Sequence, residues 1–392
     1  MKILFIHNSY SEKTPSGEEH ASRELAALLE EHGHEVRWFK RSSDEVRSSK
    51  KLTVASFFTG VYNPFIKKEL AKIIDDFKPD VAQVQNLYPL ISSSIFGVLR
   101  KYHIPVVMRC PNYRLFCPSG LSLDKSGQVC ERCWRKGHEW WCIKGNCENS
   151  IPKSVGYALR NSFNRITGKI SDGVDVFIVQ SEFQKKKFIG QGIPEHKIGI
   201  VPGISPNVTP RSDVYMGEWV SFVGRVSAEK GIYEFIEAAR LNPGIPFKVA
   251  GSLDANFEKP QDIPNNLEFV GFLKGADLDD FYLKSRIIVV PSKWYEGFPN
   301  VILRGFLLNR PVVTTNIGAM QSIVETGVNG ILVEPGSVED LSKAISELYP
   351  QINLCRKYGE AGREKSLTAY SREQIYDYLM EIYSRARNNS FA

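Results

Sequence analysis

Two cations in the second half of the chain stand where they could hold a diphosphate. Arg225 and Lys230 belong to FVGRVSAEKGIYEFIEA (222–238), where an apolar run is followed by an amphipathic one. These runs predict a strand and then a helix, so Arg225 follows the strand and Lys230 precedes the helix. Gly224 and Gly231 give the backbone freedom beside the cations. Because arginine supplies a planar fork of donors and lysine a point charge, the pair suits a diphosphate leaving group.

A carboxylate occupies an equivalent loop further along the chain. The segment VVPSKWYEGFPNVILRGFLLNRPVVTT (289–315) predicts strand, loop, helix and strand, with Glu296 in the loop. Four residues then lead into the predicted helix N-terminus, where backbone N–H groups attract anions: Gly297, Phe298, Pro299 and Asn300. Since both segments are strand-to-helix loops of one predicted domain, we interpret them as functional rather than as surface decoration.

Short apolar strands alternate with helical segments along the whole chain. The first series predicts strands at 2–7, 79–85, 104–110, 174–180 and 197–202. The second series predicts strands at 218–225, 245–251, 267–272, 286–292, 311–315 and 330–335. This alternation predicts an α/β fold of two doubly wound, Rossmann-like domains with parallel sheets. Ligands of such folds bind at the carboxyl ends of the strands, so we expect them in an interdomain cleft.

The two series give the domain boundaries. We predict one domain at 1–203, with a cysteine-rich insert at 110–150, and a second at 204–370. The segment 203–213 is rich in Pro, Ser and Asn, which is typical of a linker. Residues 371–392 predict an amphipathic helix that packs back toward the first domain, with four residues on one face: Ile375, Tyr378, Leu379 and Ile382.

The first predicted strand is followed by a helical pattern at 20–36, which includes Val36, with Gly33 as its stop. No G-x-G-x-x-G separates them, only Gly17, so a dinucleotide dehydrogenase fits poorly. Gly17 either lets backbone N–H groups approach a phosphate or is an ordinary turn glycine. The sequence leaves both interpretations open.

Charge is distributed unevenly between the two halves. Residues 1–200 contain 30 Lys and Arg against 21 Asp and Glu, whereas residues 201–392 contain 20 against 23. The basic half predicts an anionic partner for the first domain, such as a membrane leaflet or a lipid phosphate. Nucleic acid is not expected, because the sequence has no recognition-module signature. With no apolar run of about 20 residues and no signal-peptide pattern, we expect a cytoplasmic protein at the inner face of the membrane.

Five of the seven cysteines gather at residues 117–147 of the insert: Cys117, Cys130, Cys133, Cys142 and Cys147. The pairs C-x2-C and C-x4-C are typical of tetrahedral thiolate sites, so structural zinc is one interpretation, with His138 as a substitute ligand. The other is a set of reduced cysteines packed against three aromatic residues: Trp134, Trp140 and Trp141.

At these segments the sequence resembles the retaining glycosyltransferases of the GT-B fold, family four (glycosyl transferases group 1). The resemblance covers nearly the whole chain and includes GRVSAEKG, PSKWYEGFPNVIL, ETGVNGILVEPGS and NYRLFCPSG. It implies that Arg225 and Lys230 hold the pyrophosphate of a nucleoside-diphosphate sugar, UDP or GDP, and that Glu296 faces the donor sugar. Phe298, Pro299 and Asn300 would present backbone to sugar and phosphate. The reaction would need no metal, because the cations stabilise the departing diphosphate.

The resemblance also implies an acceptor on the first domain, near four residues: Asn86, Asn112, Tyr113 and Arg114. The acceptor would be lipid-linked or an oligosaccharide, in cell-surface or exported polysaccharide assembly. Two alternatives remain: a non-catalytic nucleotide-sugar-binding partner subunit and a nucleotide-sugar epimerase.

Two positions depart from the family pattern. Arg304 stands where relatives have a second glutamate that grips the nucleotide ribose, and Pro111 stands where many have a histidine. Guanidinium only donates hydrogen bonds, so it cannot replace a carboxylate as an acceptor of two hydroxyl protons. Since a cation beside a helix N-terminus is unfavourable, we expect Arg304 to reach the diphosphate or to pair with Glu296.

Overall fold

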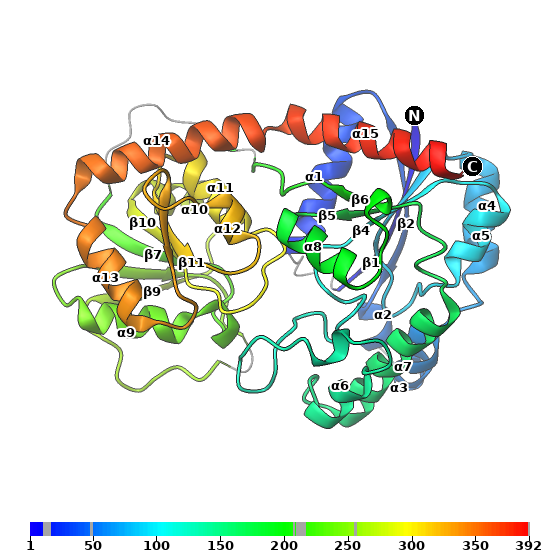
Figure 1. Ribbon diagram of the computed structural model, residues 1–392, viewed down its shortest axis with the longest axis horizontal. Helices are drawn as coiled ribbons and strands as arrows, with labels where there is room; N and C mark the ends of the chain where they lie inside the picture. Colours follow the sequence, from blue (N-terminus) through cyan, green and yellow to red (C-terminus); the bar gives the residue numbers. More distant parts are fainter. Residues whose placement is uncertain (11–16, 48–49, 207, 209–216, 255–256, 391–392) are drawn as a thin grey trace. The chain divides into compact units, whose positions relative to one another are not determined.

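The computed structural model describes residues 1–392 except 11–16, 48–49, 207, 209–216, 255–256 and 391–392. The chain forms two compact units, each built on its own sheet (Figure 1). Unit 1 comprises Met1–Lys125, Cys130–Pro202 and Ile375–Ala392, and unit 2 comprises Ser126–Val129 and Gly203–Gln374. Most of the predicted linker, 203–213, lies outside the described residues.

Unit 1 contains a six-stranded parallel sheet in the order β2-β1-β3-β4-β5-β6. Its strands are β1 (Lys2–Ser9), β2 (Glu35–Ser42), β3 (Val81–Asn86), β4 (Val106–Arg109), β5 (Val176–Val179) and β6 (Ile198–Ile200). Its helices are α1 (Gly17–Glu31), α2 (Asp44–Arg47), α3 (Lys50–Val61), α4 (Lys67–Phe77), α5 (Ile95–Lys101), α6 (Trp140–Gly145), α7 (Ile151–Thr167) and α8 (Glu182–Gly190).

The strand β2 was not predicted. The sequence pattern predicts one helix over 20–36, but α1 ends at Glu31 and Val36 lies in β2. Gly33 adopts a left-handed conformation, with φ of +77°, which ends the helix and turns the chain. Because β2 lies at the edge of the sheet and is only partly buried, its sequence lacks the continuous apolar run that marks the other strands.

Unit 2 repeats the architecture with the strand order β12-β11-β10-β7-β8-β9, all parallel. Its strands are β7 (Trp219–Val223), β8 (Phe247–Ala250), β9 (Leu267–Gly271), β10 (Ser285–Val290), β11 (Val312–Thr315) and β12 (Gly330–Val333). Its helices are α9 (Ile232–Leu241), α10 (Gly275–Leu283), α11 (Asn300–Leu307), α12 (Met320–Ile323), α13 (Val338–Leu348) and α14 (Ile352–Ala369). The predicted α/β fold with two Rossmann-like sheets is confirmed.

The core of each unit lies between sheet and helices. In unit 2, Phe222 of β7 packs against Phe235 of α9, with ring centroids 5.7 Å apart, inside a cluster of fully buried residues. Burial of such side chains on both faces of a parallel sheet stabilises the fold by about 1.5–3 kcal/mol each. In the described part of the chain, no helix is long and apolar enough to cross a membrane.

The last helix, α15 (Arg372–Ser390), contributes its apolar face to unit 1 from Ile375 onward. Ile375, Leu379 and Ile382 are buried. The hydroxyl of Tyr383 hydrogen-bonds to the Gln83 side chain of β3.

The backbone packing of unit 2 can be tested at Gly231, which lies between the short 3-10 turn Ala228–Lys230 and α9. Its φ is +78°, and an added Cβ would lie 1.9 Å from the carbonyl oxygen of Pro291. We expect Gly231→Ala to lower the free energy of unfolding by more than the roughly 1–2 kcal/mol of a left-handed alanine, because the loop after β10 must also move. Gly244→Ala, where nothing lies within 4 Å of the new methyl, is the control. Equal melting temperatures for the two variants would contradict this account.

Candidate functional site

The candidate site in unit 2 lies where β7 and β10 end. These strands are neighbours in a parallel sheet, so the loops that follow them emerge at the same edge. The loop after β7 carries Arg225 and Lys230, and the loop after β10 carries Glu296. The structure therefore brings the two predicted segments together.

Glu296 is held by hydrogen bonds to one of its two oxygens. Its Oε1 accepts from Lys230 Nζ at 2.5 Å, from Ser292 Oγ at 2.8 Å and from Trp294 Nε1 at 2.9 Å. The side chain is nearly buried, with 8% of its surface exposed. Among the described residues, no group donates a hydrogen bond to Oε2. One oxygen is thus fixed, and the other remains available to a hydroxyl donor.

Lys230 is held by Glu296 and by the ring of Trp294. Its ammonium lies 5.3 Å from the ring centroid of Trp294, on which it forms a cation–π contact. An ammonium has three N–H donors, and Glu296 uses one of them. Lys230 can therefore stay bound to Glu296 while it donates to a phosphate oxygen.

Arg225 is positioned by two carboxylates. Its Nη1 donates to Asp254 Oδ2 at 2.9 Å, and its Nη2 donates to Glu229 Oε1, which also accepts from Ser227 Oγ at 2.7 Å. Nearly half of the Arg225 side chain is exposed. Since a guanidinium has five N–H donors, this arrangement leaves some for an incoming anion.

The backbone of this loop is tightly packed. Gly224 has φ of +143°, and a Cβ added to Gly251 would lie 1.7 Å from the Gly224 carbonyl oxygen. The positive φ explains the glycine at 224, after β7, and the close approach explains the glycine at 251, after β8. The predicted contact of Gly224 with a donor stays a prediction.

The residues that precede α11 are arranged largely by packing. Pro299 is the N-cap of this helix. The ring of Phe298 lies 5.3 Å from that of Tyr370, and a Cβ on Gly203 would meet both Phe298 and Asn300 at less than 3.0 Å. Because the Phe298 ring packs in these contacts, a ligand would meet the backbone of this segment rather than that side chain. Gly297, which is buried, also has only backbone atoms to contact a ligand.

Arg304 has a partner that the sequence did not predict. It lies in the last turn of α11, where the helix dipole favours a cation, rather than beside the N-terminus. Its Nη1 forms an ion pair with Asp279 of α10. The expected pairing with Glu296 is wrong, since the hydrogen bonds of that carboxylate come from Lys230 and two neutral donors.

Three of the predicted acceptor-side residues form a network in unit 1. Arg114 Nη1 donates to Tyr10 Oη at 2.8 Å and to Asn86 Oδ1 at 3.3 Å. Asn86 Nδ2 donates to the Asn8 carbonyl at 2.7 Å, and Asn112 Oδ1 accepts from the Arg114 backbone. These contacts connect the carboxyl ends of β1 and β3 with the loop after β4.

Tyr113 and Pro111 complete that loop. Tyr113 has no exposed surface, and its ring lies 5.2 Å from that of Trp134. Its side chain therefore packs within unit 1 and has no surface for a ligand. Pro111 is partly exposed in the same loop.

Gly17 is the first residue of α1 and is followed by two carboxylates. Glu19 Oε1 accepts from the Tyr10 backbone at 2.6 Å, and Glu18 Oε2 accepts from the Tyr10 hydroxyl at 3.3 Å. Burial raises the pKa of Glu18. Carboxylates at this N-terminus would compete with a phosphate, which favours the interpretation of Gly17 as a turn glycine.

The cysteines of the insert interact with one another. Cys142 and Cys147 share a hydrogen bond, which lowers the pKa of Cys147 to about 7. Burial raises the pKa of Cys133 to about 12. Within the described residues, no group of three or more His, Cys, Asp or Glu side chains is arranged to hold a metal ion.

Structural zinc at these cysteines, with or without His138, stays a prediction. If the thiolates bind zinc, the purified protein should contain about one equivalent, and Cys130→Ser should lower its melting temperature. Metal analysis that finds no zinc would favour the packed, reduced thiols.

Sequence reasoning missed the residues that orient the predicted ones. Ser292 and Trp294 lie within the quoted PSKWYEGFPN segment, so their closeness to Glu296 was a usable signal. Glu229 is four residues from Arg225, a spacing that favours pairing. Asp254 and Asp279 carried no such signal, because packing of distant segments brings them to their partners.

The Arg304–Asp279 pair can be tested by charge reversal. Arg304→Glu places two carboxylates together, so we expect the free energy of unfolding to fall by about 1–3 kcal/mol, between the values for exposed and buried pairs. The double variant Arg304→Glu with Asp279→Arg should recover most of this loss. Thermal melts measure both, and a double variant no more stable than Arg304→Glu alone would refute the pairing.

Comparisons with known proteins relate unit 2 to a known family. Residues 216–365 match the model of the family glycosyl transferases group 1. The chain is 29% identical over 294 residues to an uncharacterised 42.6 kDa protein of the cps region of Klebsiella pneumoniae, with 74% of this chain and 70% of that protein covered. It is 28% identical over 174 residues to the capsular polysaccharide biosynthesis glycosyltransferase CapM of Staphylococcus aureus, with 42% of this chain and 45% of that protein covered. This second alignment spans less than half the length of CapM.

Among solved structures, the chain is similar to Anabaena HepE in complex with UDP. The TM-score is 0.67 at 18% identity, with 98% of this chain and 100% of that chain covered. Identity at this level indicates the fold alone. Over residues 216–365, unit 2 thus has the sequence pattern of the glycosyl transferases of group 1, and the chain has the α/β fold seen in HepE.

Proposed function

We propose that this protein is a glycosyltransferase that takes a sugar from a nucleoside-diphosphate sugar. The observation that carries the proposal is the Lys230–Glu296 pair, with Arg225 in the neighbouring segment of the same loop. Two cations at the carboxyl edge of a parallel sheet would bind the diphosphate. The Glu296 carboxylate, together with the backbone at the start of helix α11, would bind the sugar.

The proposed chemistry needs positive charge where the diphosphate departs. The bond between the anomeric carbon and the diphosphate oxygen breaks, and the acceptor hydroxyl oxygen bonds to the same carbon. Lys230 and Arg225 would stabilise the charge that develops on the departing diphosphate, which is the task a metal performs in other transferases. The acceptor proton would pass to a diphosphate oxygen. The acceptor would attack the face from which the diphosphate departs, and the anomeric configuration would therefore be retained.

Glu296 would orient the sugar through its second oxygen. Oε1 is occupied by Lys230, Ser292 and Trp294, while Oε2 can accept a hydrogen bond from a sugar hydroxyl. Three donors on one oxygen keep the carboxylate from rotating. A fixed acceptor of this kind contributes to catalysis by positioning the reacting carbon.

The relatives favour a role in cell-surface polysaccharide assembly. One belongs to a cps region, and CapM takes part in capsular polysaccharide biosynthesis. The UDP in HepE favours a uridine donor, with GDP as the alternative. We further propose a lipid-linked or oligosaccharide acceptor, reached at the cytoplasmic face of the membrane.

A second candidate is a non-catalytic nucleotide-sugar-binding subunit, and Arg304 is the observation that favours it. This side chain is engaged by Asp279, so a carboxylate grip on the ribose is replaced by an ion pair. Thermal-shift screening with UDP-, GDP-, ADP- and dTDP-sugars identifies the donor. Slow release of free sugar from that donor supports the transferase, whereas binding with no release supports the second candidate.

The Lys230–Glu296 pair gives the sharpest test by mutation. Glu296→Gln keeps the size of the side chain but removes its charge, and Lys230→Ala removes the cation, so we expect each to lower donor turnover about 100- to 1000-fold. Lys248→Ala is the control: Lys248 is also 26% exposed, pairs with Glu268 and stacks on a tryptophan. Turnover of either site variant equal to that of the control would remove the basis of the proposal.

A further inference from the structure

A cavity of about 700 Å³ lies in unit 1, within reach of the Arg114 network. Its floor includes Tyr10, Tyr88 and Arg114, which follow β1, β3 and β4. Its walls come from α3 and α7, which Figure 1 shows side by side. The cavity has the size of sites that bind small organic ligands.

The walls are largely apolar. Phe57 and Phe58 of α3 face the lining of α7, and a Cβ added to Gly156 of α7 would lie 2.9 Å from the Phe57 ring. The two helices therefore touch at Gly156, and the cavity extends from this contact along Pro89 and Tyr157. Such a lining suits a flexible hydrocarbon chain.

The same cavity contains three cations: Arg114, Lys153 and Arg160. Among the described residues that line it, none is an aspartate or glutamate, and none of the three cations forms a salt bridge with a described carboxylate. Arg160 is almost completely buried between the rings of Tyr88 and Tyr157, at 4.4 and 4.5 Å from their centroids. Its guanidinium donates to the Asn161 side chain and to the Pro118 carbonyl, which are neutral acceptors, so an anionic ligand would add a charged acceptor.

The nearest carboxylates do not cancel this charge. Glu18 interacts electrostatically with Arg114, and Glu148 interacts with all three cations, but neither carboxylate lines the cavity. Burial raises the pKa of both carboxyl groups, and the three cations outnumber these two carboxyl groups. The cavity therefore combines an apolar lining with an excess of positive charge.

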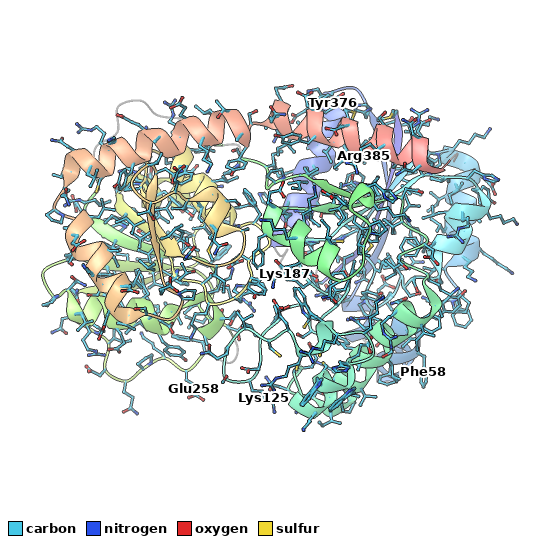
Figure 2. All side chains as sticks on the ribbon, viewed as in Figure 1. Phe58, Lys125, Lys187, Glu258, Tyr376 and Arg385 are labelled. Atoms are coloured by element: carbon cyan, nitrogen blue, oxygen red, sulfur yellow. The ribbon has the colours of Figure 1, made fainter. Side chains whose placement is uncertain are left out.

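The cavity is open at an apolar edge. Phe58 lines it and is nevertheless 67% exposed, and Figure 2 labels this side chain in the region of α3 and α7. Ile151, next to the lining residue Pro152, is also exposed. A long hydrocarbon chain could leave the cavity along these side chains, with its polar end against the arginines.

We propose that this cavity binds a phosphate group carried on a hydrocarbon chain, that is, a lipid phosphate. Arg114, Lys153 and Arg160 bind the phosphate, and the aromatic residues of α3 and α7 bind the chain. The assignment of this ligand as the acceptor rests on the proposed function. Binding itself does not, so the two can be tested separately.

Calorimetric titration of the full chain, without any nucleotide, tests the proposal with three probes. Farnesyl phosphate carries both features, farnesol lacks the phosphate, and inorganic phosphate lacks the chain. We expect farnesyl phosphate to bind at least about tenfold more tightly than either of the others. Farnesol binding as tightly as farnesyl phosphate, or inorganic phosphate doing so, would overturn the proposal.

Charge-changing variants locate the binding. Phe58→Glu and Lys153→Glu alter exposed lining residues, so the fold should persist, and each should weaken farnesyl phosphate binding about tenfold or more. Phe65→Glu and Lys101→Glu are matched controls, because both residues are exposed in unit 1 and lie outside the lining. Unchanged affinity in both lining variants would place the ligand elsewhere and refute the proposal.

The same titrations separate this inference from the proposed function. Farnesyl phosphate binding at the cavity, with no turnover of any nucleotide sugar, would leave the cavity assignment standing and refute the transferase. Turnover of a nucleotide sugar, with no binding of farnesyl phosphate, would refute the lipid-phosphate site alone. UDP binding that is unchanged in Phe58→Glu would show that the cavity is distinct from the nucleotide site.

Discussion

The nearly buried carboxylate of Glu296 forms an ion pair with the ammonium of Lys230, whose side chain is 26% exposed, and this contact joins two loops of unit 2. An isolated charge there would be costly, so each group requires the other and requires further donors such as Ser292 and Trp294. The contact fixes the loop after β10 against the loop after β7. Gly231 permits it, since only a residue without a side chain fits between Lys230 and the backbone of Pro291. Charge pairing, close backbone packing and the edge of a parallel sheet therefore converge on one small region.

The site cations of unit 1 have different surroundings from those of unit 2. Where unit 2 pairs its site cations with carboxylates, unit 1 keeps Arg114 and Arg160 beside aromatic rings. Two neighbouring carboxyl groups, Glu18 and Glu148, interact with these cations, and burial raises the pKa of both. The excess of basic residues in the first half of the sequence is thus partly an internal property of the fold, concentrated beside a cavity, as well as a property of the surface.

The sequence predicted those features that arise from local pattern. Buried parallel strands are continuous apolar runs, so eleven of the twelve strands in the described part of the chain could be assigned. Arg225, Lys230 and Glu296 also lie in the loops that the sequence predicts for them. The strand β2 was not predicted, because this edge strand is only partly buried and lacks a continuous apolar run. The Arg304–Asp279 pair and the cavity between α3 and α7 escaped because packing joins segments far apart in the chain. The spacing of residues along the chain does not predict such contacts. The partner of Arg304 was predicted wrongly because the sequence did not give the length of α11, which places Arg304 in the last turn of the helix.

The central claim is that the diphosphate of a nucleotide sugar binds at Lys230 and Arg225 in unit 2. A crystal structure of the protein with its best nucleotide-sugar donor tests this most directly. We expect phosphate oxygens within about 2.7–3.0 Å of Lys230 Nζ and of the Arg225 guanidinium, with a sugar hydroxyl donating to Glu296 Oε2. A diphosphate bound instead at the arginines of unit 1, or at neither set of cations, would contradict the account.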